Sequence, residues 1–279
     1  MRRSKAATNT PDLWQHQLPR RDHRSNKYTH GHALIMGGPV HSTGAARLAA
    51  LSALRSGAGL VSIGCDALSL PVYASSLMSV MTKLVQSPAE LEQLLADNRI
   101  RALLAGPGAG TGEHTRQTVL QLLKSRKPCV LDADALTSFS DSLSVLIDAV
   151  HESTILTPHE GEFTRLFGDI QERELAALDA AQQSKAVVIL KGHETVIAAA
   201  DGRIVVNRCA TPNLATAGSG DVLAGIVTGM LCQGMPAFEA ACAGVWLHSQ
   251  SAHGYGPGLI ADDLPGLIPK ALASLEVAG

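Results

Sequence analysis

Residues 217–225 carry the clearest chemistry in this 279-residue sequence, because a turn of small residues runs directly into an apolar segment and holds one acid, Asp221. Backbone N–H groups at Gly218, Ser219 and Gly220 would be free to bind an anion at the start of the helix that follows. A carboxylate beside such amides suits phosphoryl transfer, since it can take or orient the proton of the attacking hydroxyl. Asp221 could instead only cap the helix.

Two acids, Asp132 and Asp134, follow another apolar run. Carboxylates two residues apart could hold a magnesium–phosphate group, directly or through water, and a turn that caps a helix at Asp134 explains them equally well. Residues 191–195 lie between two further apolar runs, which predicts a tight turn. The ammonium group of Lys191 in this turn could meet a phosphate or could simply be exposed to solvent.

The segment Thr157-Pro158-His159-Glu160 predicts a capping box, with threonine at the N-cap, proline at the first helical position and glutamate at the third. This explanation leaves His159 without a structural role. Glu162 could equally be a surface acid.

Short apolar runs alternate with helix-length segments along the chain, which is the pattern of a parallel sheet with crossover helices. Strands that are apolar throughout are covered on both faces, and ligands bind at their carboxyl ends. We expect strands at 32–36, 60–63, 102–105, 129–131, 154–156 and 186–190, and a hairpin of 195–199 and 203–207. We expect helices at 43–56, 113–124, 160–166, 172–184, 220–232, 237–253 and 261–274.

Composition restricts the class of protein. Hydrophobic residues make up 46% and charged residues 17% of the chain, which excludes a disordered or fibrous protein. A net charge of −2 and an aromatic content of 3% argue against a nucleic-acid partner. The five cysteines form no C-x-x-C pair, and the histidines between residues 30 and 41 lack the spacing of a metal site, so no protein metal ligand is predicted.

The first 27 residues carry seven Lys or Arg and two Asp. We expect residues 1–26 to form a basic, solvated extension and residues 27–279 to form a single domain. No apolar segment follows the first arginines, and cysteine usage fits a reducing compartment, so the predicted location is cytoplasmic. The apolar stretch 222–248 is interrupted by polar residues and a proline, which favours two buried helices over a membrane span.

Together these segments resemble the ADP-dependent NAD(P)H-hydrate dehydratase family, a carbohydrate-kinase-related group of the ribokinase-like superfamily. The resemblance covers roughly residues 27–272. Each short motif is weak evidence alone, and the specificity of the match lies in the order and spacing of the motifs. The matching motifs are Gly37-Gly38, Thr43-Gly44-Ala45-Ala46, residues 55–61, Gly106-Pro107-Gly108, residues 131–136, residues 156–163, Lys191-Gly192, Thr195-Val196 and residues 213–225.

The resemblance implies an α/β fold: a ribokinase-like three-layer αβα sandwich with a mostly parallel central sheet. It implies dehydration of the S form of hydrated NADH or NADPH (NADHX or NADPHX), with ADP, or ATP in some members, as co-substrate together with Mg²⁺. AMP and phosphate are the other products. Phosphorylation would turn a poor leaving group, hydroxide, into a good one. The sequence leaves the choice of nucleotide and of hydrate open.

In this family pattern Asp221 is the acid or base at the substrate hydroxyl, and the Gly218, Ser219 and Gly220 amides steady the phosphoryl group. The positions that meet the hydrated nicotinamide are Ala45, Gly108, His159 and Asp221. The residues expected to line the adenine-nucleotide pocket are Lys191, Gly192, His193, Glu194, Thr195, Gly218, Ser219 and Gly220.

Many bacterial relatives are fused to an epimerase that interconverts the two hydrate forms, so we expect a separate NAD(P)HX epimerase as functional partner. We also expect a homo-oligomer. Two other functions fit the same residues. One is a small-molecule alcohol kinase of the hydroxymethylpyrimidine or hydroxyethylthiazole type, which would release a stable phosphoester. The other is a nucleotide sensor that does not turn over.

Overall fold

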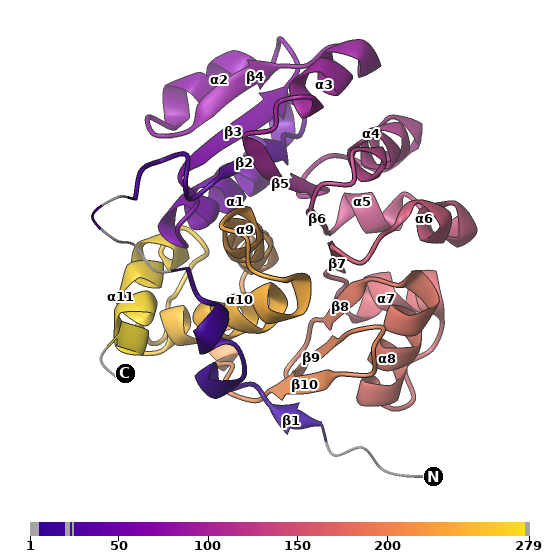
Figure 1. Ribbon diagram of the computed structural model, residues 1–279, viewed down its shortest axis with the longest axis vertical. Coiled ribbons are helices and arrows are strands. Elements are labelled where there is room, and N and C mark those ends of the chain that lie inside the picture. Colours follow the sequence, from indigo (N-terminus) through magenta and orange to yellow (C-terminus); the bar gives the residue numbers. More distant parts are fainter. Residues whose placement is uncertain (1–5, 20–22, 24, 277–279) are drawn as a thin grey trace.

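The computed structural model describes residues 6–19, 23 and 25–276. Within these residues the chain forms a ten-stranded sheet in the order β1-β10-β9-β8-β7-β6-β5-β2-β3-β4 (Figure 1). The strands are β1 (Ala7–Thr8), β2 (His32–Met36), β3 (Leu60–Cys65), β4 (Met81–Leu84), β5 (Ile100–Ala105), β6 (Cys129–Leu131), β7 (Thr154–Leu156), β8 (Val187–Leu190), β9 (Thr195–Ala198) and β10 (Ile204–Asn207).

The sheet is mostly parallel. Every neighbouring pair from β8 to β4 runs parallel, whereas β9 runs antiparallel to both β8 and β10. The expected hairpin at residues 195–207 is therefore confirmed. Because parallel strands end at the same edge of a sheet, the loops that follow β2, β5, β6, β7 and β8 lie along one edge.

Helices cover both faces of the sheet (Figure 1), and the predicted three-layer αβα sandwich is confirmed. Successive residues of β2 alternate between the two cores: Ala33 and Ile35 pack in one, Leu34 and Met36 in the other. The first face carries α1 (Thr43–Arg55), α2 (Leu70–Ser76), α9 (Ser219–Cys232), α10 (Ala237–Ala252) and α11 (Leu264–Glu276). The second carries α3 (Pro88–Leu95), α4 (Glu113–Lys124), α5 (Asp134–Thr137), α6 (Leu143–Ala149), α7 (Glu160–Phe167) and α8 (Arg173–Ser184).

Helices α1 and α9 pack at unusually close range because glycines face α1. A Cβ added at Gly225 would lie 2.2 Å from the carbonyl oxygen of Ala49, and one at Gly229 would lie 2.7 Å from that of Ala53. This contact fixes the start of α9 relative to α1. The apolar stretch 222–248 forms the two buried helices α9 and α10, as predicted. None of the described helices has the length and hydropathy needed to cross a membrane.

The expectation of a solvated N-terminal segment is wrong for the residues around Trp14. Strand β1 pairs with β10, and Trp14 is fully buried against Trp246, with ring centroids 5.6 Å apart. Asn9 is also buried; its amide donates to Cys242 O at 2.9 Å, and its side-chain oxygen accepts from Trp14 Nε1 at 3.1 Å. The free energy gained by burying this large aromatic ring and forming its hydrogen bond holds the segment against the domain, although most residues nearby are polar.

Several elements were not predicted. They are β1, α2, β4, α3, α5 and α6, and α11 begins at Leu264 rather than at residue 261. The missed helices are short, and β4 is an edge strand whose Met81 and Leu84 are exposed, so neither gives a long apolar pattern.

Replacement of Gly225 by alanine tests the contact between α1 and α9. We expect Gly225→Ala to lower the free energy of unfolding by about 1–3 kcal/mol, because the new methyl group overlaps a carbonyl oxygen. Gly266→Ala in α11 is the matched control, since no heavy atom lies within 4 Å of its added Cβ. It should raise stability by about 0.5–1 kcal/mol. Urea denaturation of both variants measures the difference, and equal effects would contradict the close contact.

Candidate active site

The start of α9 presents open backbone amides. Gly218 is the N-cap residue and adopts a left-handed conformation with φ of 87°. Ser219 N donates to Thr216 O, and Val222 N donates to Gly218 O. The N–H groups of Gly220 and Asp221 have no acceptor within the described part of the chain. Two unpaired donors at the N-terminus of a 14-residue helix form a site that attracts an anion.

Position 218 requires glycine for two reasons: the backbone is left-handed, and there is no room for a side chain. An added Cβ would lie 2.8 Å from Leu48 Cδ1 and 2.9 Å from Ala261 Cβ. Leu48 lies one turn after Ala45 on α1, so α1 supports the glycine turn directly. The prediction that these small residues form a tight turn before a helix is confirmed.

Asp221 lies in the first turn of α9 and is not the N-cap residue, so the simple capping interpretation is wrong. Burial, followed by the nearby charge of Asp132, raises the pKa of Asp221 to about 6, although Lys191 acts in the opposite direction. A carboxyl group with this pKa can accept a proton near neutral pH more readily than an ordinary aspartate.

Lys191 lies at the centre of a buried charge cluster and is not a solvent-exposed side chain. Its Nζ donates to Asp132 Oδ1 at 2.6 Å and lies 3.8 Å from Glu162 Oε2. Burial acts to lower the pKa of Lys191, but the carboxylates of Asp132, Glu162 and Asp221 outweigh this effect and raise it. Lys191 is therefore a fixed cation, and a Cβ added at Gly220 would lie 3.5 Å from its Nζ.

The cap of α7 is shifted by two residues from the prediction. His159, not Thr157, is the N-cap residue, and Glu162, not Glu160, completes the capping box. His159 Nδ1 accepts hydrogen bonds from the N–H groups of Gly161 and Glu162. Glu162 Oε2 accepts from His159 N at 2.8 Å. Glu162 is buried, so the interpretation as a surface acid is wrong.

Asp132 and Asp134 do not act as a pair. Asp132 is buried and bonded to Lys191, whereas Asp134 is the first residue of α5 and accepts a hydrogen bond from Gly110 N at 2.8 Å. Ala133 between them has a positive φ of 48°, which turns the two side chains to different partners. The predicted turn is present, but the expected cap at Asp134 is wrong, because Ala133 is the N-cap residue of α5. Asp132 belongs to the charge cluster.

Ala45 and Gly108, which are 63 positions apart in the chain, lie together at the same edge of the sheet. A Cβ added at Gly108 would lie 3.2 Å from Ala45 Cβ, and Gly108 O accepts from Ser42 Oγ at 2.7 Å. A Cβ added at Gly38 would lie 1.9 Å from Gly108 O. The loops after β2 and β5 therefore touch through small residues, as close approach to a ligand would require.

The turn after β8 contains the remaining predicted nucleotide-binding residues. Gly192 and His193 are exposed, and Thr195 is buried with its hydroxyl donating to Gly192 O. Glu194 pairs with Arg208 at 3.2 Å. Arg173 donates to Lys191 O at 3.0 Å and so holds the turn from α8. The structure places these residues beside Lys191 and leaves their contact with a nucleotide a prediction.

The sequence analysis missed His248 of α10. Its Nε2 shares a hydrogen bond of 3.1 Å with Ser219 Oγ at the start of α9. Burial lowers the pKa of His248 to about 4, so the ring is neutral at pH 7. Its position in an apolar helix gives no sequence signal for this contact, because only the packing of α10 on α9 brings the two side chains together.

This arrangement combines an anion-binding helix start, a buried cation and a carboxyl group of raised pKa, which are the parts that phosphoryl transfer to a hydroxyl needs. Within the described residues, no group of three or more His, Cys, Asp or Glu side chains is placed to hold a metal ion.

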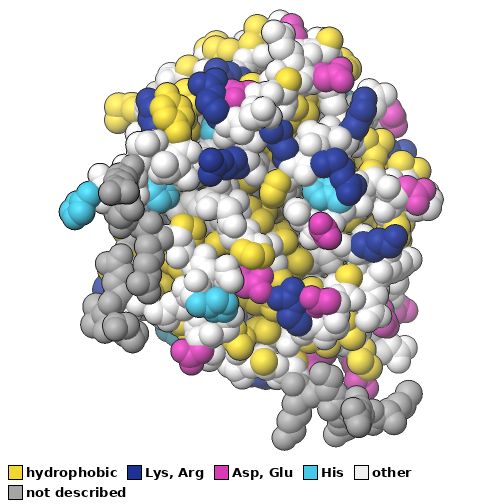
Figure 2. Space-filling model, viewed as in Figure 1, with side chains coloured by type: hydrophobic (Ala, Val, Ile, Leu, Met, Phe, Trp, Pro, Cys, Tyr) yellow, Lys and Arg dark blue, Asp and Glu magenta, His cyan; other side chains and the backbone are white. Residues whose placement is uncertain are grey.

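On the face of the molecule shown in Figure 2, basic and acidic side chains are interspersed.

The sheet and its flanking helices have the α/β fold of ribokinase-like proteins. A sequence model described as NAD(P)H-hydrate dehydratase matches residues 33–259. The chain belongs to this family, and the resemblance found in the sequence is confirmed.

The relatives give the same assignment. The chain is 37% identical over 264 residues to the ADP-dependent (S)-NAD(P)H-hydrate dehydratase of Neisseria meningitidis, with 89% of this chain and 87% of that protein covered. It is 38% identical to the bifunctional NAD(P)H-hydrate repair enzyme of Moorella thermoacetica over 93% of this chain. The chain spans about half the length of such bifunctional relatives, 52% in the Moorella case.

Among solved structures, the ADP/ATP-dependent NAD(P)H-hydrate dehydratase of Bacillus subtilis, co-crystallised with ATP and Mg²⁺, superposes with a TM-score of 0.82. The two chains are 31% identical, with 98% of this chain and 99% of that chain covered.

A double-mutant cycle tests the buried ion pair. Lys191→Met should lower the free energy of unfolding by about 3 kcal/mol, because it leaves buried carboxylates without their cation. The double variant with Asp132→Asn should recover at least about 1 kcal/mol, which chemical denaturation of the four proteins measures. Strictly additive losses would show that the pair is not energetically coupled.

The raised pKa of Asp221 predicts a stability gain on removing its charge. The pKa in the folded protein is about 6 and the ordinary value is 3.8, so the folded state loses stability as pH rises from 3.8 through 6. Asp221→Asn should therefore be about 1–3 kcal/mol more stable than the wild type at pH 8, and the gain should disappear toward pH 4. Exposed Asp262→Asn is the control. A gain that does not change with pH would contradict the buried charge.

Proposed function

We propose that this protein dehydrates (6S)-NADHX or (6S)-NADPHX to NADH or NADPH, with ADP converted to AMP and phosphate. One observation carries the proposal: a carboxyl group of raised pKa, Asp221, lies on the helix turn whose open amides and neighbouring Lys191 attract a phosphoryl group. Family membership supports it, because relatives of similar length are named for this reaction.

In the first step the hydroxyl oxygen on ring carbon six attacks the terminal phosphorus of ADP, AMP leaves, and Asp221 takes the hydroxyl proton. In the second step the ring nitrogen lone pair expels the phosphate, which breaks the carbon–oxygen bond. A proton then leaves the adjacent ring carbon and restores the dihydronicotinamide. The amides of Gly220 and Asp221 and the ammonium group of Lys191 stabilise charge on the transferring phosphoryl group.

We propose that Mg²⁺ arrives with the nucleotide phosphates. Asp132 already pairs with Lys191, and the described residues offer no closed set of metal ligands. Phosphate oxygens and water would therefore supply most of the coordination shell, which is usual for magnesium. When bound, the ion would neutralise phosphate charge together with Lys191, whose ammonium group also pairs with Asp132.

The two nucleotides approach the centre from opposite sides in this proposal. ADP lies toward Lys191, Gly192, His193, Glu194 and Thr195 after β8, and the hydrated nicotinamide lies toward Ala45, Gly108 and His159. The order β8-β7-β6-β5-β2 separates these two sets of loops along the edge of the sheet. The start of α9, which packs against α1, supplies Gly218, Ser219, Gly220 and Asp221 between them.

The remaining expectations extend the same proposal. The enzyme would act in the cytoplasm on small-molecule substrates as a homo-oligomer, with one catalytic domain that includes β1 and the buried Trp14 as well as the residues from 27 onward. A separate NAD(P)HX epimerase would supply the S form of the hydrate.

Removal of the Asp221 carboxylate tests the reaction directly. Purified protein is mixed with hydrated NADH, ADP and Mg²⁺, and both the reduced-nicotinamide absorbance and free phosphate are followed. Asp221→Asn should lower kcat/KM at least ~100-fold with little change in ADP affinity, whereas Asp262→Asn should be active. Formation of a stable phosphoester without free phosphate would instead establish an alcohol kinase.

The pH profile gives an independent check on the role of Asp221 as base. With a pKa of about 6, kcat/KM of the wild type should fall about tenfold between pH 7 and pH 5. A flat profile over this range would exclude a base with the raised pKa.

A further inference from the structure

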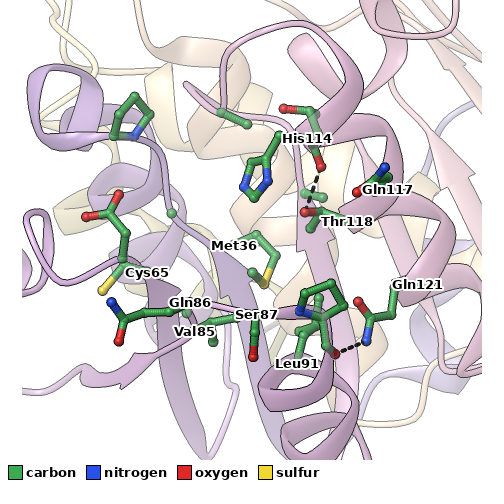
Figure 3. Close-up of a pocket in the computed structure, with 18 of the residues that line it drawn as sticks. Met36, Cys65, Val85, Gln86, Ser87, Leu91, His114, Gln117, Thr118 and Gln121 are labelled. Atoms are coloured by element: carbon green, nitrogen blue, oxygen red, sulfur yellow. Dashed lines mark hydrogen bonds between the residues drawn. The ribbon is translucent and has the colours of Figure 1, made fainter.

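A cavity of about 470 Å³ opens at the carboxyl ends of β2, β3 and β5, between α3 and α4. Its volume is in the range of small-molecule binding sites. Met36, Val85 and Leu91 contribute apolar surface, and α4 contributes polar side chains from one wall. Figure 3 shows His114, Gln117, Thr118 and Gln121 along α4, with the His114 ring directed toward Met36.

The polar lining is almost entirely uncharged. Among the described residues, no Lys or Arg lines the cavity, and the single acidic lining residue, Asp66, uses its carboxylate to accept hydrogen bonds from Leu68 N, Ser69 N and Ser69 Oγ. The side chains of His114 and Gln86 form no hydrogen bond within the described residues and remain available to a ligand. An apolar surface with neutral donors and acceptors suits a purine base and its ribose, not a phosphate group.

The rim of the cavity adjoins loops of the candidate active site. Gly106 lines its rim, and a Cβ added there would lie 1.7 Å from Asp132 O. The carboxylate of the same Asp132 pairs with Lys191 in the charge cluster. Gly37 and Ala109 also line the rim, and they adjoin Gly38 and Gly108, the loops that meet near Ala45. A ligand with one end beside Ala45 and Gly108 can therefore reach the cavity with its other end.

We propose that this cavity binds the adenosine end of the hydrated dinucleotide. This assignment rests on the proposed function. The nicotinamide end then lies beside Ala45 and Gly108, and the pyrophosphate crosses the glycine-rich rim at Gly37 and Gly106. The phosphates of ADP need cationic and amide partners, which lie at Lys191 and the start of α9. The neutral cavity therefore serves the dinucleotide and not the co-substrate.

A bulky side chain placed in the cavity tests this assignment. His114 lies in the exposed first turn of α4, and its side chain makes no hydrogen bond with the described residues, so His114→Trp should fold and fill part of the space. We expect its KM for NADHX to rise at least tenfold, with KM for ADP within twofold of the wild type. Lys124→Trp adds the same side chain to α4 outside the cavity, and should leave both values unchanged.

Hydrated reduced nicotinamide mononucleotide, which lacks adenosine, is the matched substrate. Its KM should be the same for His114→Trp and the wild type. Thermal unfolding checks that His114→Trp is folded, and Gln117→Trp replaces it if it is not.

An unchanged KM for NADHX, or an equal rise for the mononucleotide, overturns the assignment. A rise in KM for ADP overturns it too, because the cavity would then hold the co-substrate. If the wild type dehydrates no hydrate at all, the proposed function has failed before this assignment is reached.

Discussion

The contact between Lys191 and buried carboxylates is the interaction on which the site depends. Asp132, Glu162 and Asp221 converge on one ammonium group, and burial of such charges without a partner would cost several kcal/mol. One cation does not compensate three anions equally. Asp132 makes the shortest contact with Lys191, at 2.6 Å, and its own charge then acts on Asp221. Burial first, and the charge of Asp132 second, hold the pKa of Asp221 above its ordinary value, and Lys191 offsets only part of this effect.

The sheet brings these groups together. Asp132 follows β6, Glu162 lies in the helix after β7, and Lys191 follows β8, and these three strands are neighbours. Asp221 arrives from a different part of the chain, on α9, whose position depends on glycines packed against α1. The charge cluster therefore depends on two constraints at once: the strand order on one side and close helix packing on the other.

The buried strands could be predicted to within a few residues because each is a continuous apolar run, and the turn before Asp221 has a distinctive run of small residues. Helix α3 was missed although Ser87-Pro88-Ala89-Glu90 is a capping signal that the structure uses: Ser87 Oγ accepts from Glu90 N. The cap of α7 was misplaced because Thr157–Glu160 matches the usual capping-box sequence, whereas the histidine N-cap that the structure uses does not. The contact of Lys191 with Asp132, 59 positions away, depends on strand order, which one sequence does not give.

The shifted cap also limits what His159 can do. Its Nδ1 already accepts two backbone N–H groups, so the neutral ring carries its proton on Nε2, and that atom lies 3.3 Å from Glu162 Oε1. Glu162 in turn lies 3.8 Å from Lys191. A substrate that meets the half-exposed ring of His159 therefore contacts a group held by the same carboxylate that faces the buried cation. The capping box thus has two effects: it starts α7, and it places the Nε2 atom of His159 beside the carboxylate of Glu162.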